Sequence, residues 1–146
     1  NLTLHVCGLS PDKESDFIKQ YEDLLSATNI HWHGRLDIDD ATKIIDLCQF
    51  TILPSCSEGC ATSVLTTMAR GCIPIVTEQT GIEFPEKIVI EDLSIESVYK
   101  AVILANLMSS MELDVLSTKS EDWCKAKHNV DTFKSQMNSA LSQIIG

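Results

Sequence analysis

The sequence predicts an α/β fold, a doubly wound parallel sheet in a Rossmann-like three-layer α/β/α arrangement with a helical C-terminal tail. Three observations support this class. Short apolar runs alternate with segments whose apolar residues recur at helical spacing, the alternation continues to Asn106, and helical patterning dominates from Glu112 onward. Strands that alternate with helices form parallel sheets covered on both faces through right-handed crossovers. With 146 residues, the chain is expected to form one domain.

The N-terminal segment predicts two strand–helix pairs. Residues 2–7 (LTLHVC) are mostly apolar and run into Gly8, which indicates a strand and a turn. A helix opens at Pro11 and Asp12, and its apolar face is expected to contain Phe17, Ile18, Tyr21, Leu24 and Leu25. Residues 29–33 (NIHWH) alternate like a strand and end at Gly34. The helix that follows is expected to be capped by Asp39 or Asp40, with Ile44, Ile45 and Leu47 facing inward.

Residues 50–81 form the most informative segment. The apolar run 50–53 (FTIL) predicts a buried strand that stops at Pro54, and a loop of small and hydroxylated residues follows. Helical spacing then links Val64, Leu65, Met68 and Ala69 until Gly71 closes the helix. A second apolar run, 73–76, completes a βαβ unit. In such sheets ligands bind at the carboxyl ends of the strands, where helix N-termini point.

The C-terminal part of the sequence predicts one more strand and a set of helices. Residues 87–90 (KIVI) are expected to form a short strand, and Ser94 starts a helix. The apolar positions of that helix are Val98, Ala101, Val102, Leu104 and Ala105. From Glu112 to the end we expect helices, with a break near His128 and Asn129.

Composition limits the classes of partner. The chain carries 21 acidic and 11 basic residues, a net charge of −10. This charge repels polyphosphate backbones and argues against a nucleic-acid partner. Since Lys and Arg form no cluster, it also argues against docking on anionic lipid. No apolar stretch reaches the about 18 residues of a membrane span, and no signal-peptide pattern occurs. The start at Asn1, directly before a strand, suggests a piece of a longer protein.

The cysteines indicate thiols rather than a metal site or disulfides. The six are Cys7, Cys48, Cys56, Cys60, Cys72 and Cys124. Cys7, Cys48 and Cys72 adjoin apolar strands or helix ends, where a thiol behaves as a small hydrophobe. Cys56 and Cys60 have three residues between them, and no further cysteine or histidine pair completes a zinc set. We therefore expect reduced thiols and a cytoplasmic location.

The loop at residues 55–63 is a candidate anion site. A helix N-terminus exposes unpaired N–H groups and carries positive potential, so residues 61–64 would offer amides and two hydroxyls to a phosphate. Gly59 allows close approach to the backbone, and Glu58 is able to accept hydrogen bonds from sugar hydroxyls. The alternative is that Thr62 or Ser63 caps the helix and that Glu58 is merely solvated.

The run ILPSCSEGCATSVLTTMARGCIPIVTEQTG resembles the donor-binding signature of retaining glycosyltransferases of the GT-B fold, in particular the large family four (glycosyl transferases group 1). Its PS and EG elements match Pro54-Ser55 and Glu58-Gly59, and Met68 to Pro74 is similar to its M-A-x-G-x-P element. Upstream, residues 4–8 are similar to the family's strand-then-Gly element, 32–36 (WHGRL) to its V-x-F-x-G-x-L/V element and 39–50 to its helix ending in A-D. The resemblance covers roughly residues 2–105.

The resemblance implies a role for each matching residue in binding a nucleotide-sugar donor. Glu58 matches the first Glu of an E-x7-E motif, which holds donor sugar hydroxyls, and is the catalytic candidate. The segment matching the diphosphate loop comprises Gly59, Cys60, Ala61, Thr62, Ser63 and Val64. Gly8 belongs to the strand-then-Gly element, and the segment matching the nucleobase contact comprises Gly34, Arg35 and Leu36. Thr66 occupies the place of the second Glu, and its shorter, uncharged oxygen predicts weaker binding of the ribose.

The resemblance further implies what lies outside this chain. The family transfers a sugar, here expected to be a hexosyl unit, with retained configuration; its donor is a substrate, and no metal or other cofactor is required. The basic residues that counter the diphosphate, the acceptor and much of the cleft belong to segments before Asn1, so the isolated piece is expected to be inactive. The terminal helix of the family often crosses back to the N-terminal domain. Exposed apolar surface near Trp123 and the C-terminal helix would then mark a missing neighbour.

Competing local interpretations are less favoured. Asp37-Ile38-Asp39 spells the D-x-D metal motif of the other major glycosyltransferase fold, but an acidic pair before a helix is a good cap. His31 and His33 share a strand face without an evident third metal ligand, and Cys60 has no nearby histidine to activate it as a nucleophile.

Two other functions remain as alternatives. One is a catalytically degenerate domain that serves protein assembly, which Thr66 motivates. The other is an unrelated phosphate-binding hydrolase, for which neither G-x-x-x-x-G-K-[S/T] nor G-x-S-x-G is present.

Overall fold

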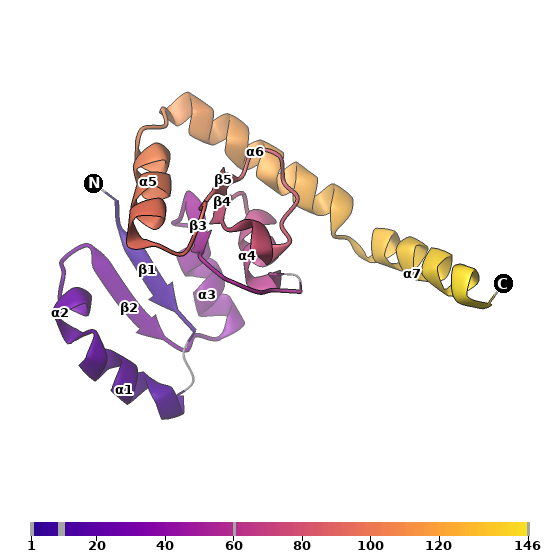
Figure 1. The fold of residues 1–146 in the computed structure, drawn as a ribbon. Coiled ribbons are helices and arrows are strands. Elements are labelled where there is room, and N and C mark those ends of the chain that lie inside the picture. Colours follow the sequence, from indigo (N-terminus) through magenta and orange to yellow (C-terminus); the bar gives the residue numbers. More distant parts are fainter. Residues whose placement is uncertain (1, 9–10, 60, 146) are drawn as a thin grey trace. The chain divides into compact units, whose positions relative to one another are not determined.

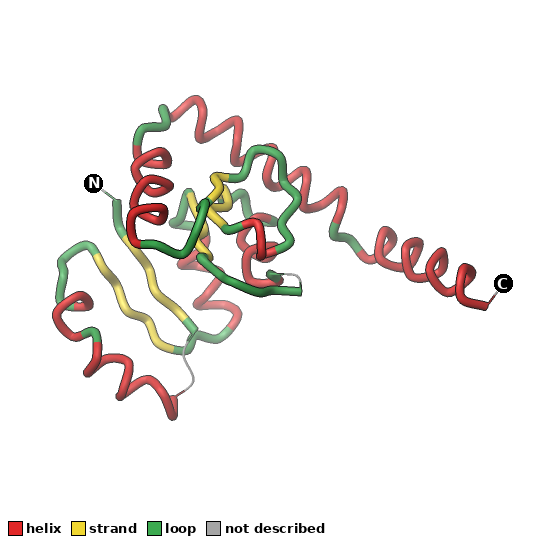
Figure 2. Tube along the Cα trace, viewed as in Figure 1, coloured by secondary structure: helices red, strands yellow, loops and turns green. Residues whose placement is uncertain are grey.

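A computed structural model describes residues 2–8, 11–59 and 61–145 of the chain (Figures 1 and 2). The contacts divide the chain into two compact units, Asn1–Leu47 (unit 1) and Cys48–Gly146 (unit 2). Every strand pair is parallel, helices flank the strands, and helices alone form the C-terminal segment. The predicted α/β class with a helical tail is therefore confirmed.

Unit 1 is built on two parallel strands. Its elements are β1 (Leu4–Cys7), α1 (Pro11–Gln20), α2 (Glu22–Leu25), β2 (Ile30–Gly34) and α3 (Ile38–Ile45). His5 of β1 is in register with His31 of β2. The Phe17 ring of α1 stacks on Trp32 of β2 with centroids 5.0 Å apart, so α1 covers the face of this sheet that carries Trp32. The prediction of one helix through residue 25 is wrong, because the backbone leaves helical geometry at Tyr21, where φ is −119°.

The start of α3 corrects a second prediction. Asp37 has an extended backbone, with φ −73° and ψ 175°, and its carboxylate accepts a hydrogen bond from the Asp40 N–H at 2.9 Å. Asp37 is therefore the N-cap, and the prediction of Asp39 or Asp40 is wrong. The physical reason is that the helix begins two or three residues earlier than expected, at Ile38, which places both of these carboxylates inside its first turn.

Unit 2 contains a three-stranded parallel sheet in the order β3-β4-β5. Its strands are β3 (Phe50–Leu53), β4 (Ile73–Val76) and β5 (Ile88–Val89), and its helices are α4 (Thr62–Met68), a short 3₁₀ helix (Glu78–Thr80), α5 (Ile95–Asn106), α6 (Ser110–Lys127) and α7 (Val130–Ile145). The last strand is shorter than the predicted 87–90. Ser94 caps α5, and α6 ends just before the predicted break at His128 and Asn129, so both predictions are confirmed.

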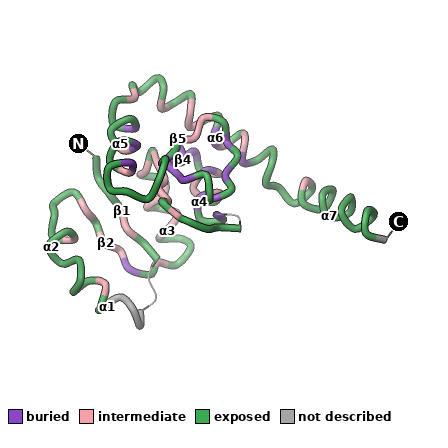
Figure 3. Tube along the Cα trace, in the orientation of Figure 1, coloured by how far each residue is buried: buried purple, intermediate pink, exposed green. Residues whose placement is uncertain are grey.

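Helices cover both faces of this sheet. All four residues of β4 are buried, and Figure 3 shows the strand inside the unit. Val76 belongs to a cluster with residues of α4 and α6, whereas Ile75 belongs to a second cluster with Ala101 and Ala105 of α5. Adjacent residues of a strand point to opposite faces. The sheet of unit 2 is therefore the middle layer of an α/β/α arrangement.

Within the described ranges, no helix by itself combines the length and the apolar composition that crossing a membrane requires. Helices α5 and α6 reach the required length and hydropathy only when taken together, and a bend of 109° separates them.

Candidate functional site

Unit 1 brings two of the predicted glycines together at the carboxyl ends of its strands. The Gly8 N–H donates a hydrogen bond to the carbonyl of Gly34 at 2.8 Å. Both glycines have positive φ, 102° and 62°, where side-chain-bearing residues are strained. The chain can therefore turn sharply at the end of each strand. These turns place the next predicted residues, Arg35 and Leu36, at the same sheet edge.

Arg35 and Leu36 line a hollow in unit 1. The hollow has a volume of about 790 Å³, and Asp37, Ile38 and Asp39 complete its lining. Arg35 is exposed and Leu36 half-buried, so the hollow offers one guanidinium group, apolar surface and two carboxylates. The predicted nucleobase segment thus lies at a concave, mixed surface. Because the sequence predicted a cap at residue 39 or 40, it did not indicate that Asp37 lines this hollow.

In unit 2, Glu58 lies in the loop that follows β3. Its side chain is exposed, and its carboxylate accepts a hydrogen bond from the Ser55 hydroxyl at 3.3 Å. Its backbone N–H donates to the carbonyl of Gln79 at 3.1 Å. The backbone of Glu58 therefore joins this loop to the segment that follows β4. Ser55 bonds to one carboxylate oxygen of Glu58, and the other carboxylate oxygen receives no hydrogen bond from Ser55.

The start of α4 lies a few residues beyond Glu58. Ala61 is the N-cap, and among the residues that the structure describes no side-chain hydrogen bond caps the helix. This excludes the alternative that Thr62 or Ser63 caps the helix. Ala61 and Val64 are buried in the cluster under α4, so only their backbone can reach a ligand, whereas Thr62 and Ser63 are exposed. Cys60 and its predicted role lie outside the described residues.

Thr66, the residue in place of the second motif Glu, is exposed on α4. Its hydroxyl donates to the carbonyl of Thr62 at 2.8 Å. Because that proton is used within the helix, the oxygen is left as a hydrogen-bond acceptor. Thr66 retains an acceptor function but lacks the charge and reach of a glutamate.

Sequence reasoning assigned no role to the residues that support the Glu58 loop. Thr77 is 1% exposed, and its hydroxyl donates to the carbonyl of Ser55. The ammonium group of Lys87 lies 2.8 Å from a carboxylate oxygen of Glu78 and 2.7 Å from the carbonyl of Ile82, which holds the loop after β4. The sequence feature that could have indicated these residues is the polar run TEQTG, which directly follows a buried strand. Polar runs in this position meet at the carboxyl edge of a parallel sheet.

No metal centre is found in the part of the chain that the structure describes, where no three His, Cys, Asp or Glu side chains are arranged to hold an ion. The D-x-D pattern serves α3 instead, because Asp37 is its cap. For His31 and His33, however, the structure adds a neighbour that the sequence could not reveal. The imidazole of His5 lies beside them, with its Nδ1 2.9 Å from Nε2 of His33.

Of the three cysteines predicted to behave as small hydrophobes, Cys72 is buried and Cys48 half-buried, whereas Cys7 is exposed because it lies at the end of β1. Cys72 donates through Sγ to the carbonyl of Cys48 at 3.4 Å, and Cys124 donates to the carbonyl of Leu65 at 3.3 Å. Burial raises the pKa of the Cys124 thiol and keeps it protonated. Cys56 is exposed.

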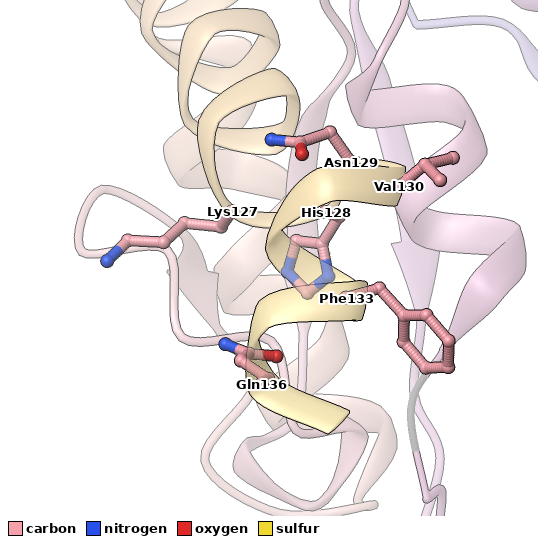
Figure 4. Close-up of a pocket in the computed structure, with 6 residues that line it drawn as sticks. All are labelled: Lys127, His128, Asn129, Val130, Phe133 and Gln136. Carbon is pink, nitrogen blue, oxygen red and sulfur yellow. The ribbon is translucent and has the colours of Figure 1, made fainter. Parts of the chain in front are cut away.

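A second hollow, of about 340 Å³, lies at the junction of α6 and α7 (Figure 4). Its lining consists of Lys127, His128, Asn129, Val130, Phe133 and Gln136. Asn129 organises this junction: its Oδ1 accepts from the Thr132 N–H and its Nδ2 donates to the Lys125 carbonyl, both at 2.8 Å. None of the predicted site residues lies here, and the residues serve the helix break.

Comparison with known proteins adds one match. Residues 1–105 match a family model described as Glycosyl transferases group 1. A search of curated proteins finds no match. The matched range ends in α5 and includes every predicted site residue.

Proposed function

The chain belongs to the glycosyl transferases group 1, whose model it matches over residues 1–105, and we propose that it binds the nucleotide-diphosphate sugar donor of that transfer. The proposal depends chiefly on one observation. The exposed carboxylate of Glu58 lies in the loop between β3 and α4, and among the described residues no side chain caps that helix. Hydroxyl donors of a sugar suit the carboxylate, and an anion suits the amides.

In this proposal different groups of unit 2 bind different parts of the donor. Glu58 accepts hydrogen bonds from hydroxyls of the donor sugar, and Ser55 holds one of its oxygens in place at 3.3 Å. The backbone amides from Gly59 to Val64 receive the diphosphate. Thr66 contributes only a neutral acceptor oxygen to the ribose. Since hydrogen bonds to a charged group contribute about 1.5–3 kcal/mol and neutral ones about 1 kcal/mol, the ribose is bound more weakly than by a glutamate.

For unit 1 we propose that the hollow lined by Arg35 and Leu36 receives the nucleobase. The apolar part of Leu36 suits the face of a base, and the backbone after Gly34 suits its polar edge. This role follows from the family resemblance of residues 32–36, and the concave surface supports it. The opposite charges of Arg35 and its two aspartate neighbours give the hollow no net positive charge.

The proposed reaction is transfer of a hexosyl unit with retained anomeric configuration. As the diphosphate leaves, positive charge develops on the sugar ring, and oxygens of the leaving phosphate help the acceptor to lose its proton. The protein supplies positioning and stabilises charge on the leaving group. In this proposal the donor is a substrate for which no metal is required. As the family resemblance implies, we propose that an N-terminal domain outside this chain binds the acceptor and supplies the countercharge of the diphosphate.

The test is an NMR titration of the ¹⁵N-labelled chain with UDP, GDP and ADP and with their glucose conjugates. We expect amide shifts within 34–36 and 58–66, and tighter binding of the sugar conjugate than of the matching diphosphate. Glu58→Gln should remove most of that difference, a loss of about 10-fold to 100-fold in affinity for the conjugate alone. Glu121→Gln, which makes the same charge change on α6, should bind like the wild type.

Shifts confined to other segments would contradict the proposal. The competing function, a degenerate domain for protein assembly, is motivated by Thr66. It gains support if the full-length protein, with its upstream residues, neither hydrolyses nor transfers sugar from any common donor.

A further inference from the structure

Three histidines lie on β1 and β2, the neighbouring strands of unit 1 (Figure 1), and the ring of His5 stacks on the other two. His5 is in register with His31, and His33 lies two residues further along β2, where the register shifts between Val6 and Cys7. The contacts that His5 makes with both rings place all three side chains on the same face. The ring centroid of His5 is 5.1 Å from that of His31 and 5.2 Å from that of His33, with interplanar angles of 21° and 10°. We call these three residues the histidine cluster.

The cluster contains one hydrogen bond whose chemistry depends on protons. His5 Nδ1 and His33 Nε2 are 2.9 Å apart, so one ring donates an N–H and the other accepts with a bare nitrogen. The pair keeps this bond while it is neutral or holds one extra proton. When both rings are protonated, no acceptor remains and two cations face each other.

We propose that the histidine cluster is an acid-sensitive link between β1 and β2, which joins the strands at neutral pH and loosens them when further protons bind. The link depends on groups that approach each other only across the strand pair. It stands independently of the donor-binding proposal.

The surroundings of the cluster reinforce this behaviour. Burial, and then the charges of His33 and His31, lower the pKa of His5 from its ordinary value. On β1, Cys7 shares the face of His5, and burial raises the pKa of its thiol, so it adds no charge near neutral pH. α1 packs through Phe17 on Trp32, which points to the opposite face. On α3, Asp37 caps the helix and Asp40 pairs with Lys43 at 2.6 Å.

The sign of the pH effect follows from the lowered pKa of His5. In the unfolded chain His5 takes up its proton near its ordinary pKa of 6.5, whereas in the folded chain burial and the neighbouring charges lower the pKa of His5. Below about pH 6.5 the unfolded state therefore binds more protons than the folded state, and stability falls as the pH falls. The loss is confined to the range between the ordinary value and the lower folded value.

Amide hydrogen exchange on the wild-type chain tests the proposal within one molecule. In unit 1 the reporters are the Leu4 N–H, bonded to Asn29, and the Gly8 N–H, bonded to Gly34. In unit 2 the references are the Ile73 N–H, bonded to Gln49, and the Ile90 N–H, bonded to Val76. Exchange is measured from pH 7.5 to 5.5 and corrected for the intrinsic exchange rates. We expect the protection factors of the unit 1 reporters to fall by up to tenfold per pH unit for each proton that the opened state binds and the folded state does not. Protection of the unit 2 references should change less.

Variants separate the cluster from other titrations. His33→Gln keeps a polar group near the Nε2 position but does not titrate, so the acid-induced loss of protection in unit 1 should shrink. In the same variant the NMR titration midpoint of His5 should rise. His128→Gln removes the histidine outside the cluster and should leave the loss unchanged. An equal acid-induced loss in both units of the wild type would overturn the proposal, even if His33→Gln failed to fold.

Discussion

At the scale of single residues, Gly71 shows how one position controls the packing of unit 2. Its φ of +86° lies in the region that favours glycine, and a Cβ built on it would lie 2.5 Å from the hydroxyl oxygen of Ser117 on α6. The adjacent turn is bonded to the same helix, because the buried Ser120 hydroxyl donates to the carbonyl of Cys72 at 2.7 Å. The turn after α4 and the surface of α6 therefore fit only without a side chain at residue 71.

Gly71→Ala should accordingly destabilise unit 2. The strained backbone and the shift forced on Ser117 together predict a loss of about 1–3 kcal/mol in the free energy of unfolding. Urea unfolding followed by tryptophan fluorescence measures this loss, because Trp123 packs on Phe84 in the same unit. The matched control is Gly59→Ala, since a Cβ at Gly59 meets no atom within 4 Å. Equal losses in the two variants would show that the fit at Gly71 is unimportant.

At the scale of elements, side-chain caps set where four of the helices begin, and Asn129 at the start of α7 is one of them. Ser94 caps α5, and Ser109 with Glu112 forms a capping box at α6, while Asp37 caps α3. Hydrogen bonds from Ser109 lower the pKa of Glu112 from its ordinary value of 4.5. A lowered carboxyl pKa means that the contribution of this cap is present above pH 4.5 and is lost as the pH falls through the folded value. α4 differs, because no side chain caps it.

Replacing the observed cap of α3 should cost more than replacing the residue predicted from sequence. Asp37→Ala removes the acceptor of the Asp40 N–H and should lower the stability of unit 1 by about 1 kcal/mol. Asp39→Ala removes a first-turn carboxylate and should cost only a few tenths of that. Hydrogen exchange of the Asp40 and Ala41 amides separates the two cases. A larger loss of stability in Asp39→Ala than in Asp37→Ala would show that Asp39 caps the helix, as the sequence predicted.

At the scale of the whole molecule, burial is distributed unevenly. The buried residues of unit 2 come from its sheet, from α4, α5 and α6, and from the segments between them, where Ile82 and Phe84 are each 1% exposed. Among the residues that the structure describes, α7 contributes none of them, and Figure 3 shows most of this helix as exposed. Its exposed apolar side chains recur at helical spacing: Val130, Phe133, Met137, Leu141 and Ile144. The core of unit 2 is therefore complete without α7.

Ending the chain after Asn129 should leave the unfolding free energy of unit 2 within about 0.5 kcal/mol of the wild type. Helical circular dichroism should decrease in proportion to the residues removed. Met68→Ala provides the contrast, because Met68 is 0% exposed and truncating it should cost about 2–5 kcal/mol. A comparable loss for the shortened chain would mean that α7 stabilises the sheet.

Local patterns determined much of the fold before any contact was known. The order of strands and helices, the cap at Ser94 and the break near Asn129 follow from periodicity and capping, which act over a few residues. Boundaries were less predictable, as the interruption at Tyr21 and the cap at Asp37 show. Strand 87–90 also shortened to Ile88–Val89, since a strand extends only as far as its neighbour pairs with it.

For the site, the sequence by itself indicated Glu58, Gly34 and the start of α4 as candidates, because a family signature records residue types and spacings along the chain. Tertiary structure alone decided which side chains support or alter them. Thr77 meets Ser55 across 22 positions, and His5 meets His33 across 28. It also decided that Ala61 and Val64 face the core and offer a ligand only their backbone. Such contacts arise from the pairing of distant strands and the burial of one helix face, which no local pattern encodes.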